Sequence, residues 1–289
     1  MSKICCPYCS SDRCKKEYEL KWKDERFATY YVAHCKDCDV GFVLPLPTPD
    51  ELDNLYNSLA YQSEDRATLD FTKASKEQID AKIKHDGLFA KRYSPHVPPS
   101  GHVLDIGAGW GTLLKSFANA GYQTTGLELS IPTSEFARNK LGLDIHNLPI
   151  ERINELPQQA YELISMRHVL EHFYDPTKVL TDLRTRMNGQ SRIIIEVPDY
   201  GSYDRKRYGT AWPAFGPYHL WYFSRASLQR LLDDTGFEIL MFHTFMSEQV
   251  LGGSSLAHKL GRKVLNRLNA KRLFSGRSIG LIAKKRTDF

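Results

Sequence analysis

The 289-residue chain lacks any apolar run approaching the roughly 18–20 residues that a membrane-spanning helix needs. Its first ten residues, MSKICCPYCS, lack the apolar stretch of a secretory signal. It also has no internal repeat and no low-complexity tract. With 42% hydrophobic and 25% charged residues, the composition is that of an ordinary globular protein. These features argue against an integral membrane protein, a secreted precursor and a repeat array, and they predict a cytoplasmic protein.

Acidic side chains are scarce near the C-terminus. Residues 250–289 contain ten Lys and Arg but a single acid, Asp288. One interpretation of residues 254–277 is a helix packed on a sheet with a solvated basic face. The other is attraction to an anionic membrane surface, a lipid-linked glycan or a phosphorylated acceptor, which would make the protein peripheral to the membrane.

Four of the six cysteines form two C-x-x-C pairs, CPYC at 6–9 and CKDC at 35–38. Each pair can present two thiolates to one ion, and two pairs together complete a tetrahedral four-thiolate site. Such spacing in a chain without a secretory signal favours reduced thiols and metal over disulfides. The predicted Zn²⁺ ligands are Cys6, Cys9, Cys35 and Cys38, with Cys5, Cys14 and His34 as spare candidates.

The segment between the two pairs is rich in Tyr, Trp and Thr, as in a β-hairpin, so residues 1–45 are predicted to form a zinc ribbon. A module of this size buries too little surface to fold alone, and we interpret the metal as structural. Docking of a substrate on the ribbon surface stays open. Residues 46–99 are predicted to be a helical connection, with a helix start at Thr48, Pro49 and Glu51.

A glycine-rich turn follows the apolar strand HVLDI at 102–106. Gly107, Gly109 and Gly111 alternate there, and a helix follows, so a ligand can lie against bare backbone near a helix N-terminus. The next strand ends at Glu128, whose carboxylate can accept hydrogen bonds from ribose hydroxyls. The third glycine of a dinucleotide fingerprint would stand at Thr112, and no P-loop GK[ST] is present.

The pattern D-x-G-x-G-x-G resembles motif I of class I S-adenosylmethionine (SAM) methyltransferases. The resemblance implies that the loop faces the amino-acid end of SAM and that Glu128 holds the ribose. Many members hold the adenine amine with an acid after the third strand. That region here reads HNLPIE, which leaves Asn147, Glu151 or a backbone carbonyl. The cofactor-binding residues predicted in this way are Asp105, Gly107, Ala108, Gly109, Gly111, Glu128, Leu129, Asn147 and Arg167.

Strands and helices alternate along residues 100–289, which predicts an α/β domain with a parallel, doubly wound sheet. Ligands bind such sheets at the carboxyl ends of the strands. Together with the resemblance, this gives a Rossmann-like, seven-stranded class I methyltransferase sheet preceded by the small zinc-ribbon module.

The stretches HVLEHFYDP, PDY and HLWYFS resemble the methyltransferase-23-like branch, which contains small-molecule O- and N-methyltransferases. A hydroxyl acceptor needs a base for its proton. The candidate catalytic residues are His168, Glu171, His172 and His219, although His168 has an equal claim to a structural role. The long aromatic connection 200–223 is predicted to be a substrate lid, with core packing accounting for some of its rings.

Two other functions remain as alternatives. A ribosomal-RNA methyltransferase with a zinc finger would explain the basic C-terminal segment. However, the fourth strand lacks the [ND]-P-P-[FY] motif of enzymes that methylate base amines, and acids offset the lysines of the ribbon, so the sequence argues against nucleic acid. A non-catalytic SAM-binding scaffold is the second alternative. We expect SAM-dependent methylation, preferably on oxygen, of a small molecule, a sugar or a lipid-linked acceptor.

Overall fold

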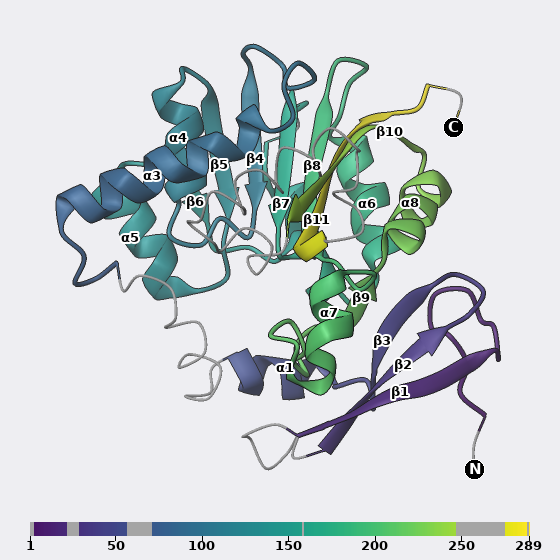
Figure 1. The fold of residues 1–289 in the computed structure, drawn as a ribbon. Helices are drawn as coiled ribbons and strands as arrows, with labels where there is room; N and C mark the ends of the chain where they lie inside the picture. Colours follow the sequence, from purple (N-terminus) through teal and green to yellow (C-terminus); the bar gives the residue numbers. More distant parts are fainter. Residues whose placement is uncertain (1–2, 22–28, 57–70, 158, 247–274, 288) are drawn as a thin grey trace, which may run out of the picture. The chain divides into compact units, whose positions relative to one another are not determined.

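The computed structural model describes residues 3–21, 29–56, 71–157, 159–246, 275–287 and 289 (Figure 1). Two compact units are present, one from residues 1–65, 197–231 and 244–279, the other from residues 66–196, 232–243 and 280–289. The predicted domain limits 1–45, 46–99 and 100–289 stay predictions. The basic segment is outside the described residues from 254 to 274, so its interpretation also stays open.

The first unit contains a four-stranded sheet in the order β1-β2-β3-β9. Its strands are β1 (Cys14–Lys21), β2 (Thr29–Cys35), β3 (Val40–Leu44) and β9 (Trp221–Phe223). The predicted hairpin is therefore present, and β9 extends it by pairing antiparallel with β3. Helix α1 (Pro49–Tyr56) begins where the sequence predicts, because the Thr48 hydroxyl accepts from Glu51 N–H and the Glu51 carboxylate accepts from Thr48 N–H.

The aromatic connection 200–223 folds against this sheet. It contains α7 (Tyr203–Tyr208) and the 3-10 helix η4 (Gly209–Ala211), and α8 (Arg225–Asp234) begins just after it. Tyr200, Trp212 and Tyr222 are each at most 2% exposed, and their rings contact one another. Core packing, the alternative to a lid, accounts for these three rings.

The larger sheet has seven strands in the order β10-β11-β8-β7-β4-β5-β6. Their bounds are β4 (His102–Ile106), β5 (Gln123–Leu127), β6 (Asp144–His146), β7 (Leu163–Arg167), β8 (Arg192–Pro198), β10 (Phe237–Met246) and β11 (Ser275–Lys285). The pairs along β8-β7-β4-β5-β6 are all parallel, as predicted. The seven-stranded sheet as a whole is mixed, because Arg286 N–H just after β11 donates to the Gly236 carbonyl just before β10, as in an antiparallel pair. The prediction of a wholly parallel sheet is therefore wrong at this edge. The last strand, β11, lies between β8 and β10, an order that the sequence analysis did not specify.

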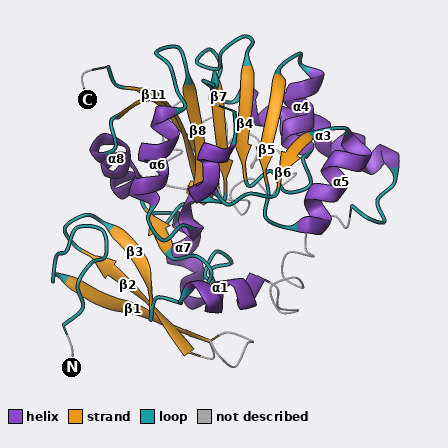
Figure 2. Cartoon of the chain, turned by 180° about the vertical axis from the view of Figure 1, so that it is seen from behind, coloured by secondary structure: helices purple, strands orange, loops and turns teal. Residues whose placement is uncertain are grey.

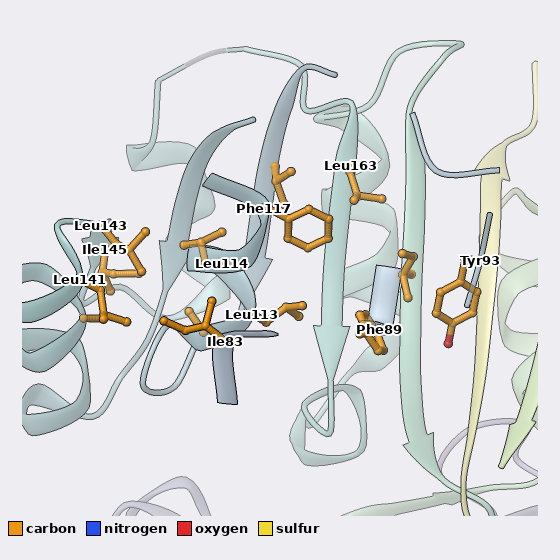
Figure 3. Packing of buried hydrophobic residues seen from close by; sticks show 14 of the residues in the cluster. Ile83, Phe89, Tyr93, Leu113, Leu114, Phe117, Leu141, Leu143, Ile145 and Leu163 are labelled. Atoms are coloured by element: carbon orange, nitrogen blue, oxygen red, sulfur yellow. The ribbon is translucent and has the colours of Figure 1, made fainter. Parts of the chain in front are cut away.

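Helices cover both faces of this sheet. They include α3 (Lys76–Lys91), α4 (Thr112–Asn119), α5 (Ile131–Leu141) and α6 (Pro176–Thr185), with the 3-10 turns η2 (Ile150–Glu155) and η3 (Leu170–His172) between strands. Helix α3 lies in front of the sheet in Figure 1, and α6 comes to the front in the reverse view of Figure 2. Phe89 of α3 joins Leu113, Leu114 and Phe117 of α4 in one buried core (Figure 3).

Candidate functional site

The first predicted site residue along the chain is Asp105, the next-to-last residue of strand β4. Its side chain is 3% exposed and accepts a 2.5 Å hydrogen bond from the Ser165 hydroxyl of β7. Burial raises the pKa of Asp105 to about 7, against the effect of that hydrogen bond. Asp105 therefore connects β4 to β7 beneath the glycine loop. A direct cofactor contact by Asp105 stays a prediction.

The glycine loop after β4 is shaped by two different requirements. Gly107 and Gly109 both have positive φ, 69° and 53°, a conformation that glycine adopts without strain. A Cβ on Gly107 would lie 2.4 Å from Val169 Cγ2, so Gly107 is required by internal packing. A Cβ on Gly109 would meet no atom within 4 Å. Gly109 is thus where the bare backbone faces open space that a ligand can occupy.

Two hydrogen bonds fix this loop against β5. Ala108 N–H donates to the Leu127 carbonyl at 2.9 Å, and Gly109 N–H donates to the Glu128 carboxylate at 2.7 Å. The other Glu128 oxygen accepts from Ser130 N–H, also at 2.7 Å. A carboxylate offers about four acceptor positions, so Glu128 retains capacity for hydroxyl donors. The glycine loop and Glu128, the residue predicted to bind the ribose, therefore lie side by side, as binding of SAM would require.

Two further predicted cofactor-binding residues are an exposed leucine and an asparagine whose amide already forms hydrogen bonds. Leu129 is 64% exposed, directly after Glu128. The Asn147 amide donates to the Glu128 carbonyl at 2.9 Å and to Ser134 at 2.7 Å, and its oxygen accepts from Arg138. Asn147 thus stabilises the ends of β5 and β6, and its contact with adenine stays a prediction.

Asp86 of α3 is a site residue that sequence reasoning missed. It is 2% exposed and accepts from the Thr112 hydroxyl at 2.6 Å and from Lys82 at 2.5 Å, while Arg167 approaches to 3.4 Å. Burial opposes ionisation, but the hydrogen bonds from Lys82 and Thr112 hold the pKa of Asp86 below its ordinary value. Asp86 joins α3 to the start of α4, a long-range contact for which the local sequence carries no signal.

Arg167 and His168 follow at the end of β7. The Arg167 guanidinium lies 4.8 Å from the centre of the Phe89 ring. The His168 ring has Nδ1 3.6 Å from a Glu171 oxygen and Nε2 3.5 Å from a Glu196 oxygen. Burial acts against the protonated ring, but these two carboxylates outweigh it and raise the pKa of His168 to about 9. Glu196, on β8, was not predicted.

The other catalytic candidates fall in different units. Glu171 and His172 belong to η3, where a Glu171 oxygen and a His172 ring nitrogen lie within 4.8 Å of each other. Glu171 is fully buried and His172 is half-buried. His219 belongs to the first unit, where its Nδ1 lies 2.6 Å from the Ala214 carbonyl. A catalytic role for each stays a prediction.

The four cysteines of the C-x-x-C pairs meet in the first unit. Their sulfurs all lie within 4.8 Å of one another, with Cys6 3.6 Å from Cys38 and Cys9 3.6 Å from Cys35. Zinc with Zn–S bonds of about 2.3 Å would place its sulfurs about 3.8 Å apart. The donor set and these distances therefore fit a Zn²⁺ ion.

Comparison with known proteins decides the family. The methyltransferase domain family matches residues 77–241, which is more than half of the chain and includes the glycine loop and the end of β7. The chain belongs to the methyltransferase domain family. Methyltransferase-named relatives and the shared fold of SAM-dependent methyltransferase structures agree with this family.

Relatives of this methyltransferase include the ubiquinone biosynthesis O-methyltransferases of Vibrio atlanticus and Aeromonas salmonicida. The first is 35% identical over 103 residues, 34% of this chain and 39% of that protein. The second is 30% identical over 118 residues, 39% of this chain and 45% of that protein. The methyltransferase thus matches less than half the length of these relatives.

Two solved structures share its fold. A SAM-dependent methyltransferase from Archaeoglobus fulgidus is 23% identical, with a TM-score of 0.53 over 70% of this chain and 94% of that one. The 1,6-didemethyltoxoflavin-N1-methyltransferase of Burkholderia thailandensis, solved with 1,6-didemethyltoxoflavin and S-adenosylhomocysteine, is 16% identical, with a TM-score of 0.54 over 93% of this chain and all of that one. Among the described residues, no helix is both long and apolar enough to cross a membrane.

Proposed function

We propose that this methyltransferase transfers the methyl group of SAM to a hydroxyl oxygen of a small molecule or a lipid-linked or sugar acceptor. The observation that carries the proposal is the glycine loop, open above Gly109 and braced by Glu128, next to the histidine and glutamate side chains that follow β7. The names of the O-methyltransferase relatives support oxygen as the acceptor atom. Transfer to nitrogen is the second outcome that the experiment must distinguish.

The chain's own residues divide the work of binding. Gly109 leaves room for the amino-acid end of the cofactor, and Glu128 accepts from the ribose hydroxyls. Leu129 offers exposed apolar surface on the adenine side. The bound cofactor supplies a methyl carbon activated by the sulfonium. The protein then has to align the acceptor oxygen with the carbon–sulfur bond and exclude water.

The proton of the acceptor needs a destination, and we assign it to His172. As the oxygen–carbon bond forms, the carbon–sulfur bond breaks, its electron pair goes to sulfur, and the hydroxyl proton goes to the base. His168 is a poor base at neutral pH because its raised pKa leaves the ring already protonated. His172 lies beside Glu171, with a ring nitrogen within 4.8 Å of a carboxylate oxygen, and it follows the same strand as His168.

The test combines binding and transfer. Calorimetry with S-adenosylhomocysteine, before and after nuclease and high-salt treatment, should give micromolar binding that survives the treatment. Radiolabelled SAM is then offered with catechols, aromatic amines and total RNA. Label transferred to catechols, and reduced at least tenfold by His172→Ala with binding unchanged, supports the proposal. Label on the amines or the RNA alone, or loss of binding on nuclease treatment, would contradict it.

We also propose that Cys6, Cys9, Cys35 and Cys38 hold a structural Zn²⁺. The sulfur distances and the four-thiolate donor set support this assignment. The C-x-x-C turn at 35–38 and the residue after it also contact residues 224–230 of the same unit. Arg230 donates to the Asp37 carbonyl at 3.3 Å, and Ser224 donates to Asp39 at 2.6 Å. The metal therefore supports residues 197–231 as well as the ribbon.

A further inference from the structure

His168 is held on both sides by carboxylates from two different elements. Its Nδ1 faces Glu171 of η3 at 3.6 Å, and its Nε2 faces Glu196 of β8 at 3.5 Å. Glu196 also fixes the backbone, because its carbonyl accepts from His168 N–H at 2.8 Å. His168 has a φ of 55°, which a non-glycine residue adopts only where its surroundings hold it. The orientation of this ring is therefore determined by the fold.

The two partners define the protonation state that fits the geometry. An ionised carboxylate only accepts hydrogen bonds, whereas a neutral imidazole has one nitrogen with a lone pair and no proton. A neutral ring would turn that lone pair toward a carboxylate at one of its two contacts. The doubly protonated ring instead presents a positively charged N–H to each carboxylate, at the ion-pair distances of 3.6 Å and 3.5 Å. Both contacts are therefore attractive only for the imidazolium.

The two carboxylates are also more deeply buried than the histidine ring between them. Glu171 and Glu196 are 1% and 6% exposed at their side chains, whereas His168 is 43% exposed. Arg92, at the end of α3, and Arg167, on β7, place guanidinium nitrogens 3.9 Å and 4.0 Å from the second Glu196 oxygen. Burial alone would favour the neutral acid, but His168 and the two arginines keep the pKa of Glu196 below its ordinary value. Two further titratable side chains of the same unit are near these acids: His172 lies beside Glu171, and the Tyr93 phenol interacts electrostatically with Glu196.

We propose that Glu196 is a positioning residue which, together with Glu171, holds His168 as a fixed imidazolium that stabilises negative charge on the acceptor oxygen. This inference rests on the proposed O-methylation and deepens it, because it names the acceptor class. A fixed positive charge favours hydroxyls that ionise readily, which are phenols and enols, over alcohols, and it disfavours ammonium acceptors.

The first experiment uses the wild-type protein alone. Histidine side chains are labelled with ¹⁵N, the His168 signals are assigned by their loss in His168→Gln, and the ring is titrated by NMR with S-adenosylhomocysteine bound. The expected result is a His168 ring that stays doubly protonated through neutral pH and titrates well above the ordinary value of about 6.5. A midpoint at or below the ordinary value overturns the proposal.

Variants distinguish a specific effect of Glu196 on the His168 midpoint from a general effect of removing one negative charge. Glu196→Gln keeps the shape of the side chain but removes its charge, so the His168 midpoint should move to lower pH. Glu196→Asp keeps the charge and should retain most of the shift. Glu238→Gln is the matched control, because it removes a glutamate charge from β10 of the same sheet at a side chain that is 51% exposed. An unchanged midpoint in Glu196→Gln would show that Glu196 does not position the ring.

A coloured phenol tests the acceptor class. The ionised fraction of 4-nitrophenol is read from its absorbance near neutral pH, with and without the S-adenosylhomocysteine complex. A rise with the wild type, lost in His168→Gln, supports binding of an ionised phenol. An unchanged fraction contradicts this acceptor class. These readouts differ from those of the proposed function, since failed S-adenosylhomocysteine binding would overturn the latter while the His168 titration could still be measured in the free protein.

Discussion

Asp105 and Ser165 are register partners on the parallel strands β4 and β7, and the Ser165 hydroxyl donates a 2.5 Å hydrogen bond to the Asp105 carboxylate. Both residues are buried. The first acid of the glycine motif is therefore part of the sheet interior in this protein. Its protonation is coupled to folding before any ligand is considered.

The pKa of Asp105 predicts a pH dependence of stability. Because the folded-state pKa is raised to about 7, the native state binds a proton that the unfolded chain releases near pH 4. The stabilisation from this group is complete below the unfolded value and is lost as the pH rises through about 7. Asp105→Asn removes this loss.

Urea unfolding at pH 5 and pH 8 measures the effect. We expect the variant to gain stability relative to the wild type between these two pH values, by an amount of the order of a few kcal/mol. Ser165→Ala is the companion variant, and it should steepen the loss because it removes the hydrogen bond that favours the charged form. Parallel pH profiles for the wild type and Asp105→Asn would show that Asp105 titrates normally.

Gly109→Arg should abolish S-adenosylhomocysteine binding while the protein stays folded with its zinc. The Cβ position of Gly109 meets no atom within 4 Å, so the side chain enters the space predicted for the cofactor. Left-handed backbone costs a non-glycine residue about 1–2 kcal/mol. Gly107→Ala should be the less stable protein, because its Cβ collides with Val169 in addition to that strain. Thermal unfolding and calorimetry compare the two, and undiminished affinity in Gly109→Arg would mean that the site is misplaced.

Glu128→Gln should weaken S-adenosylhomocysteine binding about 10- to 100-fold, the amount expected for charge-assisted hydrogen bonds. The amide keeps one oxygen acceptor but cannot accept from Gly109 N–H and Ser130 N–H on its two sides. One of the two hydrogen bonds that hold the loop and the residues after β5 is therefore lost. Glu135→Gln is a control in the same unit, at an exposed position of α5. If both variants bound like the wild type, the ribose would have to be held elsewhere.

Cys35→Ser should release zinc and destabilise the ribbon, because a four-thiolate ion loses one of its ligands. Cys5→Ser is the matched control, since the Cys5 thiol is exposed and is not one of the four clustered sulfurs. Zinc content, thermal unfolding and S-adenosylhomocysteine binding are measured for both variants. We expect cofactor affinity within about threefold of the wild type in both variants, since the cofactor residues belong to the other unit. Full zinc loading of Cys35→Ser would contradict the assignment.

Some parts of the site were predictable because they depend on local rules. A strand, three glycines and a helix in succession predict the loop, and Thr48 with Glu51 predicts the start of α1. The C-x-x-C pairs predict the cysteine cluster, since each pair brings its two thiols together within one turn. Asp86, Glu196 and Ser165 escaped prediction because each acts on a partner at least 26 residues away.

The sequence by itself determined the family, the glycine loop, the meeting of the paired cysteines and the five parallel strands, because glycine conformation, thiol spacing and hydrophobic pattern act over a few residues. Only the tertiary structure decided that β11 lies between β8 and β10, that β9 extends the ribbon sheet, and that two buried carboxylates enclose His168. These depend on which strands pair and which side chains become buried together. That choice is made by the free energy of the whole packed core, which no short stretch of sequence contains.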